Sequence, residues 1–148
     1  MDKTDRKILN IIQTEFPVEE EPFKVLGKAI GISEDDALDR VKKLKERGII
    51  RRIGAVLDTK KMGFASTLCA ARVPEERVKE FVDAVNSYSG VTHNYRRSHT
   101  YNIWFTFIAQ SEEDIDRSLN EISEKTGIDG ILNMPVRRKF KIDASFDL

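Results

Sequence analysis

The chain of 148 residues contains a single cysteine, Cys69, and no apolar run near the roughly 20 residues that span a bilayer. One cysteine excludes an internal disulfide and is typical of a reducing compartment. The first residues, 1–12, are charged and helical in pattern, so we do not expect a secretory signal. We therefore expect a cytoplasmic protein without a membrane partner, in which Cys69 is an ordinary buried strand residue.

The chain also lacks an excess of either charge. Its 25 Lys and Arg side chains balance 25 Asp and Glu side chains, so the formal net charge is zero. This balance argues against a function that depends on bulk attraction to nucleic acid or membrane. The sequence has no P-loop, dinucleotide-binding fingerprint or nucleophile elbow. It has no Cys/His cluster either, so we do not expect a metal site made by the protein alone.

Three segments near the N-terminus have apolar residues at helical spacing: 3–14, 23–30 and 33–47. Gly31 ends the second segment as a helix C-cap would, and Ser33 stands at the N-cap of the third. The stretch 49–58 is β-like and predicts the strand pair of a wing. The order predicts a winged helix-turn-helix domain over residues 1–57.

Residues 58–148 alternate between strand and helix patterns. Strands are predicted at 64–73, at 91–97, from the turn at Ser98 and His99 to about Ala109, and at 131–142, with helices at 74–88 and 112–125. The order βαββαβ predicts a ferredoxin-like sandwich with both helices on one face of an antiparallel sheet, so the fold class is α+β. In the last strand we expect an inward-facing apolar set of Leu132, Met134, Val136 and Phe140.

The segment 91–107 has an unusual composition. It holds both histidines, two of the three tyrosines and the only tryptophan, with an Arg-Arg pair between the histidines. Planar rings, guanidinium groups and imidazoles favour a pocket for a flat, anionic ligand. The basic residues 137–139 in the last predicted strand would add cations beside this aromatic floor.

Strand alternation predicts that His93, Tyr95 and Arg97 share one face of the sheet, with Asn94 and Arg96 on the other. The next strand is apolar on both faces, although a sheet with helices on one side normally has a polar outer face. A second subunit, a large ligand or both could cover it. Some of the aromatic residues in this segment could instead have a purely structural role, because aromatic residues also form cross-strand packing pairs.

The predicted helix-turn-helix is poorly suited to DNA. Its third helix begins with Ser33 and three carboxylates, 34–36, and offers no Arg, Asn or Gln to bases in that turn. Residues 1–57 carry 12 basic and 11 acidic side chains, which leaves little charge for phosphate neutralisation. We interpret Lys42, Lys43, Lys45 and Arg47 as a solvated helix face. DNA is not an expected partner, and the domain is expected to be a scaffold or interface.

Two resemblances refine this interpretation. Residues 28–58 resemble the N-terminal domain of the Lrp/AsnC transcriptional regulators, whose C-terminal domain has the βαββαβ order and serves dimerisation and effector binding. The block His-Asn-Tyr, Arg, His, Tyr-Asn-x-Trp-Phe within 91–107 is similar to the siroheme decarboxylases. The segment Met-Pro-Val-Arg-Arg-Lys-Phe-Lys at 134–141 resembles the same family.

The second resemblance implies a carboxy-lyase of heme biosynthesis, built from two homologous subunits. Such an enzyme removes carbon dioxide from the C12 and C18 acetates of siroheme to give 12,18-didecarboxysiroheme. The candidate proton donors are His93, Tyr95 and His99. The candidate substrate-binding residues are Arg96, Arg97, Tyr101, Asn102, Trp104, Arg137 and Arg138.

The resemblance implies no required cofactor, although His93 or His99 could instead be an axial ligand to the iron of a bound heme or siroheme. Two other functions stay open at this point. One is an Lrp/AsnC-type regulator that binds a small effector. The other is a non-catalytic heme-binding partner subunit.

Overall fold

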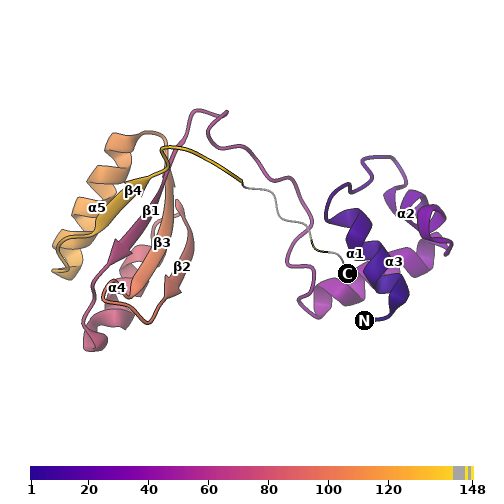
Figure 1. Cartoon of the computed structure of the whole chain (residues 1–148), viewed down its shortest axis with the longest axis horizontal. Helices are drawn as coiled ribbons and strands as arrows, with labels where there is room; N and C mark the ends of the chain where they lie inside the picture. Colours follow the sequence, from indigo (N-terminus) through magenta and orange to yellow (C-terminus); the bar gives the residue numbers. More distant parts are fainter. Residues whose placement is uncertain (142–145, 147) are drawn as a thin grey trace. The chain divides into compact units, whose positions relative to one another are not determined.

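The computed structural model describes residues 1–141, 146 and 148, which form two compact units (Figure 1). The first unit comprises residues 1–56 and the described residues from 141 onward, and the second comprises residues 57–140. Each unit has its own hydrophobic core. No helix in the described part of the chain is long and apolar enough to cross a membrane.

The first unit contains the three predicted helices. They are α1 (Lys3–Ile12), α2 (Pro22–Ile30) and α3 (Glu34–Glu46). The predicted caps are confirmed: Gly31 has a left-handed φ of 82° after α2, and the Ser33 hydroxyl accepts from the Asp36 amide at the start of α3. Ile8 and Leu26 are fully buried in the core between the helices. These caps and apolar faces produce the helix-turn-helix arrangement expected from the sequence.

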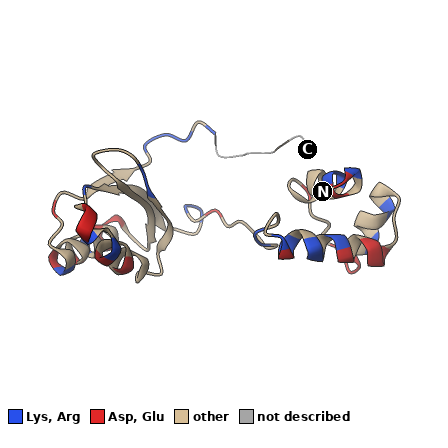
Figure 2. Ribbon diagram, turned by 90° about the horizontal axis from the view of Figure 1, so that it is seen from below, with Lys and Arg blue, Asp and Glu red and all other residues tan. Residues whose placement is uncertain are grey.

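Arg40 joins α3 to the beginning of α1. Its guanidinium donates to Asp2 at 2.8 Å, to Asp5 at 2.9 Å and to Asp36 at 3.0 Å. The hydrogen bonds to Asp2 and Asp5 raise the pKa of Arg40, and the Asp5 amide and the Arg40 guanidinium lower the pKa of Asp2. Figure 2 shows acidic residues interspersed with basic ones along the helices of this unit. The guanidinium that bonds Asp36 in the first turn of α3 is therefore already bound by carboxylates of its own unit.

The predicted wing is wrong. In the part of the chain that the structure describes, no strand precedes β1 (Ala65–Ala71). Ile50 packs on the helical core, but Val56 and Leu57 are 85% and 63% exposed. A hairpin forms only where a second segment completes the ladder of backbone hydrogen bonds, and residues 51–57 make no such bonds here.

The second unit has the predicted βαββαβ order. After β1 come η1 (Glu75–Arg77), α4 (Val78–Asn86), β2 (Val91–Arg96), β3 (Ile103–Ala109), α5 (Glu112–Thr126) and β4 (Leu132–Pro135). The four strands form an antiparallel sheet in the order β2-β3-β1-β4, and α4 and α5 pack on one of its faces (Figure 1). The ferredoxin-like prediction and the α+β class are therefore confirmed.

The core of this unit lies between the sheet and the two helices. Phe81 of α4 meets Phe105 of β3 edge to face, with ring centroids 6.3 Å apart, and both rings are fully buried. Cys69 of β1 is fully buried beside them, as predicted, and burial raises the pKa of its thiol to about 12. The thiol is therefore protonated and serves as an apolar packing group.

The last strand is shorter than predicted. It ends at Pro135, whose ring removes the backbone N–H that a continuing ladder would need. Residues 136–141 lie outside the sheet, and Ile142 lies outside the described residues. Val136 and Phe140, predicted to face the core, are 65% and 84% exposed.

The predicted inward side of this strand is also wrong. Asn133 points toward the helices, where it bonds the Thr67 hydroxyl at 2.6 Å and donates to Asp116 of α5 at 2.8 Å. Because side chains alternate along a strand, its apolar neighbours Leu132 and Met134 lie on the opposite face of the sheet. The apolar residues of β4 therefore belong to the face that carries no helix.

Candidate functional site

The sheet face without helices carries most of the predicted ligand residues. The register of the strands aligns two rows of side chains across this face, here called the open face. One row is Met134, Leu68, Thr106 and His93, and the other is Leu132, Ala70, Trp104 and Tyr95. The open face is thus aliphatic toward β4 and aromatic and titratable toward β2, which suits the contact surface of a flat molecule or a second protein chain.

A β-bulge decides which side chains of β2 reach the open face. Val91 pairs with Phe107 and faces the core, but His93, two residues later, pairs with Thr106. The extra residue, Thr92, shifts the alternation by one position. As a result, His93 and Tyr95 both face the open side. Strand alternation correctly predicted that they share a face, and the bulge determines which face it is.

His93 is held by two hydroxyl groups. Its Nδ1 lies 3.1 Å from the Thr92 hydroxyl and 3.4 Å from the Thr106 hydroxyl, and the two hydroxyls are 2.7 Å apart. The His93 ring lies nearly parallel to the Tyr95 ring, with centroids 6.0 Å apart. Thr92 and Thr106 are not among the site residues predicted from the sequence. Their β-branched side chains beside a histidine are equally typical of an ordinary strand.

The turn between β2 and β3 holds the second histidine. The Arg97 amide donates to the Asn102 carbonyl at 2.8 Å and closes the turn. Inside it, the Tyr101 amide donates to Nδ1 of His99 at 3.1 Å. The His99 and Tyr101 rings are nearly parallel at 6.4 Å, which repeats the histidine–tyrosine arrangement seen on β2.

Arg97 and Trp104 form a cation–aromatic pair. The guanidinium carbon of Arg97 lies 5.6 Å from the centroid of the indole. The indole N–H donates to the Tyr101 carbonyl at 2.7 Å, so the turn also fixes the plane of the ring. Arg97 is exposed, and its guanidinium has no carboxylate partner among the described residues. It is therefore a cation available to an anionic ligand.

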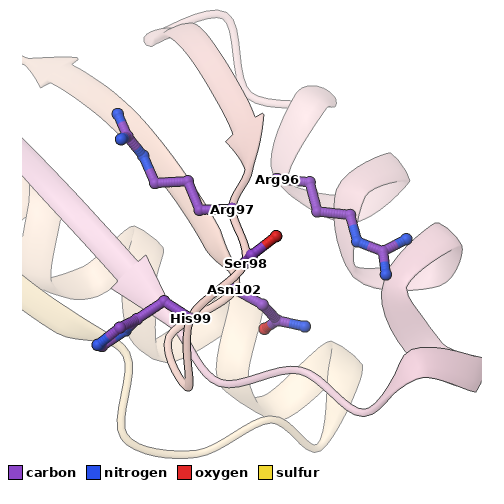
Figure 3. A pocket seen from close by; sticks show the side chains of 5 residues that line it. All are labelled: Arg96, Arg97, Ser98, His99 and Asn102. Atoms are coloured by element: carbon purple, nitrogen blue, oxygen red, sulfur yellow. The ribbon is translucent and has the colours of Figure 1, made fainter.

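Arg96 faces the other way. Its guanidinium donates to Glu75 of η1 at 2.6 Å, on the helix side of the sheet. Figure 3 shows the Arg96 and Arg97 side chains leaving the strand end in opposite directions. A surface cavity of about 550 Å³ beside them is lined by Arg96, Arg97, Ser98, His99 and Asn102. The predicted alternation, with Arg96 and Arg97 on opposite faces of the sheet, is confirmed. The structure adds that the Arg96 guanidinium is already paired with the Glu75 carboxylate.

Asn102 binds the main chain of its own unit. Its amide donates to the Val73 carbonyl at 2.8 Å and accepts from the Val73 amide at 2.9 Å. This pair of bonds ties the turn to the segment that follows β1. Asn102 thus positions the residues of the turn, and its side chain is engaged by protein groups at both its oxygen and its nitrogen.

We expect Asn102→Ala to lower the free energy of unfolding by about 2 kcal/mol, because two main-chain groups of the buried Val73 lose their partners. Asn94→Ala is the matched control, since Asn94 makes one exposed bond, at 3.0 Å, to Asn86. Urea unfolding of both variants measures the difference. Equal small losses would contradict the role given to Asn102.

The remaining predicted residues lie elsewhere in the unit. Arg137 and Arg138 follow β4, at the opposite edge of the sheet from β2 and at the opposite end of the strands from the turn. Three inter-strand spacings, about 14 Å, separate β4 from β2. Arg138 lies over the Phe140 ring at 4.9 Å. Within one chain, four of the predicted site residues therefore lie together on the open face: His93, Tyr95, Arg97 and Trp104. His99 and Tyr101 lie in the turn at the edge of this face. Arg137 and Arg138 lie apart from both groups.

The protein itself offers no metal centre in the residues that the structure describes, where no three His, Cys, Asp or Glu side chains converge. Each histidine instead has one ring nitrogen bonded within its own unit. Exposed imidazoles held in this way can donate a proton, accept one, or ligate a metal that arrives with a substrate.

Comparison with known proteins gives the class. Residues 61–141 match the AsnC-like ligand binding domain, and residues 5–51 match the siroheme decarboxylase NirDL-like HTH domain. A crystal structure of an AsnC family transcriptional regulator from Agrobacterium tumefaciens has a TM-score of 0.80 at 25% identity, covering 99% of this chain and 96% of that chain. The helix-turn-helix and the sheet unit together define a protein of Lrp/AsnC-like architecture.

The siroheme decarboxylase alpha subunit of Oleidesulfovibrio alaskensis is 54% identical over 148 residues, which are 100% of this chain and 90% of that protein. This chain therefore belongs to the siroheme decarboxylase family, a family of carboxy-lyases. The crystal structure of the siroheme decarboxylase NirDL in complex with an iron-uroporphyrin III analogue has a TM-score of 0.70 at 35% identity. That match covers 89% of this chain and 44% of that chain.

Proposed function

We propose that this chain acts as the alpha-type subunit of a siroheme decarboxylase, together with a homologous second subunit. The substrate is siroheme, and the products are carbon dioxide from the C12 and C18 acetates and 12,18-didecarboxysiroheme. The observation that supports this best is the open face, where an exposed Arg97 lies over Trp104 beside the hydroxyl-bound His93. Rings and aliphatic groups suit a flat macrocycle, and a guanidinium suits its carboxylates.

The chemistry follows from these groups. In each step the bond between the methylene carbon and the carboxylate carbon breaks, and carbon dioxide leaves. The electron pair stays on the methylene carbon, where it is delocalised into the conjugated macrocycle. A histidine proton then converts the methylene to a methyl group. Arg97 orients a carboxylate that does not react, and the rings of Tyr95 and Trp104 exclude water from the one that does.

A second subunit accounts for the uncovered aliphatic part of the open face. Leu68 and Leu132 are 38% and 37% exposed there, although neighbouring side chains on the helix side are fully buried. Burial of such residues against another chain contributes roughly 25 cal/mol for each Å² of apolar surface. The subunit also supplies groups for the carboxylates that Arg97 does not reach, because Arg137 and Arg138 of this chain lie at the far corner.

The test is an anaerobic incubation of siroheme with this chain, with its partner subunit, and with both. We expect the pair to lower the substrate mass by one and then two carbon dioxide units, and this chain alone to be much slower. No mass change with the pair would contradict the proposed activity. Full turnover by the partner alone would instead make this chain a non-catalytic subunit.

A regulator is the second candidate, since the fold is that of AsnC family proteins. The acidic start of α3 and the engagement of Arg40 by three carboxylates disfavour it. A gel-shift assay at modest salt with random duplex DNA tests this, and retarded DNA would favour the regulator.

A further inference from the structure

We infer that the two histidines have different roles: His99 is a hydrogen-bond and proton donor through Nε2, and His93 is the histidine that can ligate the siroheme iron. This inference rests on the proposed function, because it assigns parts of the same site. The hydrogen bonds at the two Nδ1 atoms carry it. Thr92 and Thr106 become positioning residues for His93, and the Tyr101 amide becomes the positioning group for His99.

The partner of His99 can only donate. A backbone N–H has no lone pair, so the Nδ1 that faces the Tyr101 amide at 3.1 Å must present its own lone pair. The neutral ring then carries its hydrogen on Nε2. In that form neither nitrogen is available to iron, because Nδ1 is occupied and Nε2 bears the proton. The free end of His99 is therefore a donor.

The partner of His93 can donate or accept. The Thr92 hydroxyl, 3.1 Å from Nδ1, can accept the imidazole hydrogen while its own hydrogen goes to Thr106 at 2.7 Å. The ring then has an unprotonated Nε2 facing away from the hydroxyl pair. A hydrogen bond at the second ring nitrogen is the usual support for a histidine that ligates a metal.

The positions of the two rings agree with this division. His93 belongs to a row of side chains on the sheet itself, which is the floor against which a macrocycle would lie. The iron is at the centre of such a molecule. His99 stands in the turn at the end of the strands, beside Arg97 and the cavity of about 550 Å³. The carboxylates are at the periphery of the molecule, where a donor in the turn can reach them.

The tautomers are measured in the full-length chain by long-range 15N–1H correlation spectra at a pH where the rings are neutral. The chain has only two histidines, so His93→Gln and His99→Gln assign the signals. We expect His99 to carry its hydrogen on Nε2, and a His99 signal from the Nδ1–H form would overturn its assignment. This measurement does not depend on decarboxylation.

Iron ligation is measured with siroheme added anaerobically to the assembled protein. We expect an imidazole-ligand absorption and EPR signature in the wild type and in His99→Gln, and its loss in His93→Gln. We expect His99→Gln to release carbon dioxide at least about 100-fold more slowly while it still binds siroheme. The opposite pattern, with the signature lost only in His99→Gln, would overturn the division of roles.

The positioning role of the hydroxyls has its own control. Thr92→Val should weaken siroheme binding by about 10-fold and reduce the iron signature, and Thr92→Ser should restore both because it keeps the hydroxyl. Equal behaviour of the two variants would overturn this role. Failure of the wild type to bind siroheme would contradict the proposed function, whereas the tautomer of His99 would still be decided by the spectra.

Discussion

Replacement of Arg97 by alanine is expected to lower kcat/KM for carbon dioxide release by about 100-fold or more. Arg97 is an exposed cation on the open face, and its guanidinium carbon lies 5.6 Å from the centroid of the Trp104 indole. Loss of the charge-assisted contact to a carboxylate that does not react leaves the macrocycle less well oriented, and the misplaced reacting acetate then costs rate as well as affinity. Anaerobic single-turnover assays with siroheme measure the effect. Arg97→Lys should recover only part of the activity, because lysine lacks the planar fork.

Arg96→Ala is the matched control for this variant. The two arginines are adjacent in sequence, but Arg96 is bonded to Glu75 on the helix side. An exposed ion pair of this kind contributes about 1 kcal/mol or less, so we expect a small change in stability and near-normal decarboxylation. If Arg96→Ala loses as much activity as Arg97→Ala, the open face is not the substrate face. Circular dichroism and thermal unfolding would confirm that both variants are folded.

Gly90→Ala is expected to have the largest effect on stability, about 3 kcal/mol in the free energy of unfolding. Gly90 precedes β2 and accepts a hydrogen bond from the Ile108 amide at 2.9 Å. A Cβ at this position would lie 2.1 Å from the Ile108 carbonyl oxygen and 3.2 Å from the Phe107 ring. The nearest obstacle is backbone, so β2 would have to move away from β3, and His93 would move with it.

Urea unfolding of Gly90→Ala should show the lower midpoint, and the siroheme assay should show reduced binding. Gly54→Ala is the control, since a Cβ there meets nothing within 4 Å and should change stability by about 0.5 kcal/mol or less. A midpoint for Gly90→Ala equal to that of Gly54→Ala would show that the strands separate without cost. That result would contradict the close approach described here.

Much of the fold was predictable because local signals agreed with the final packing. Gly31 and Ser33 mark a helix end and a helix start through their own backbone and side-chain preferences. The expectation that β3 is apolar on both faces is confirmed, since Phe105 lies in the core and Trp104 lies on the open face. The wing and the length of β4 were not predictable, because both depend on whether a neighbouring strand is present to complete the ladder.

The site was predictable in its residue types but only partly in its geometry. The segment that contains His93, His99 and Trp104 was recognised from its composition and its resemblance. The ion pair of Arg96 with Glu75 and the hydrogen bonds of Asn102 with Val73 were not predictable, because each partner lies more than 20 residues away in the chain. Sequence patterns indicate which residues of a strand share a face. They do not report whether a distant group has already taken its hydrogen bonds.

The β-bulge between Val91 and His93 sets which face of the sheet His93 occupies. If β2 paired regularly from Val91 onward with all its residues present, the two faces of the strand beyond that point would be exchanged. Asn94 and Arg96 would then lie on the open face, and His93 and Tyr95 would lie on the helix side. Loss of Thr92 alone would instead remove the bulge and leave His93 opposite Thr106, so relatives that lack one residue here should keep the same open face.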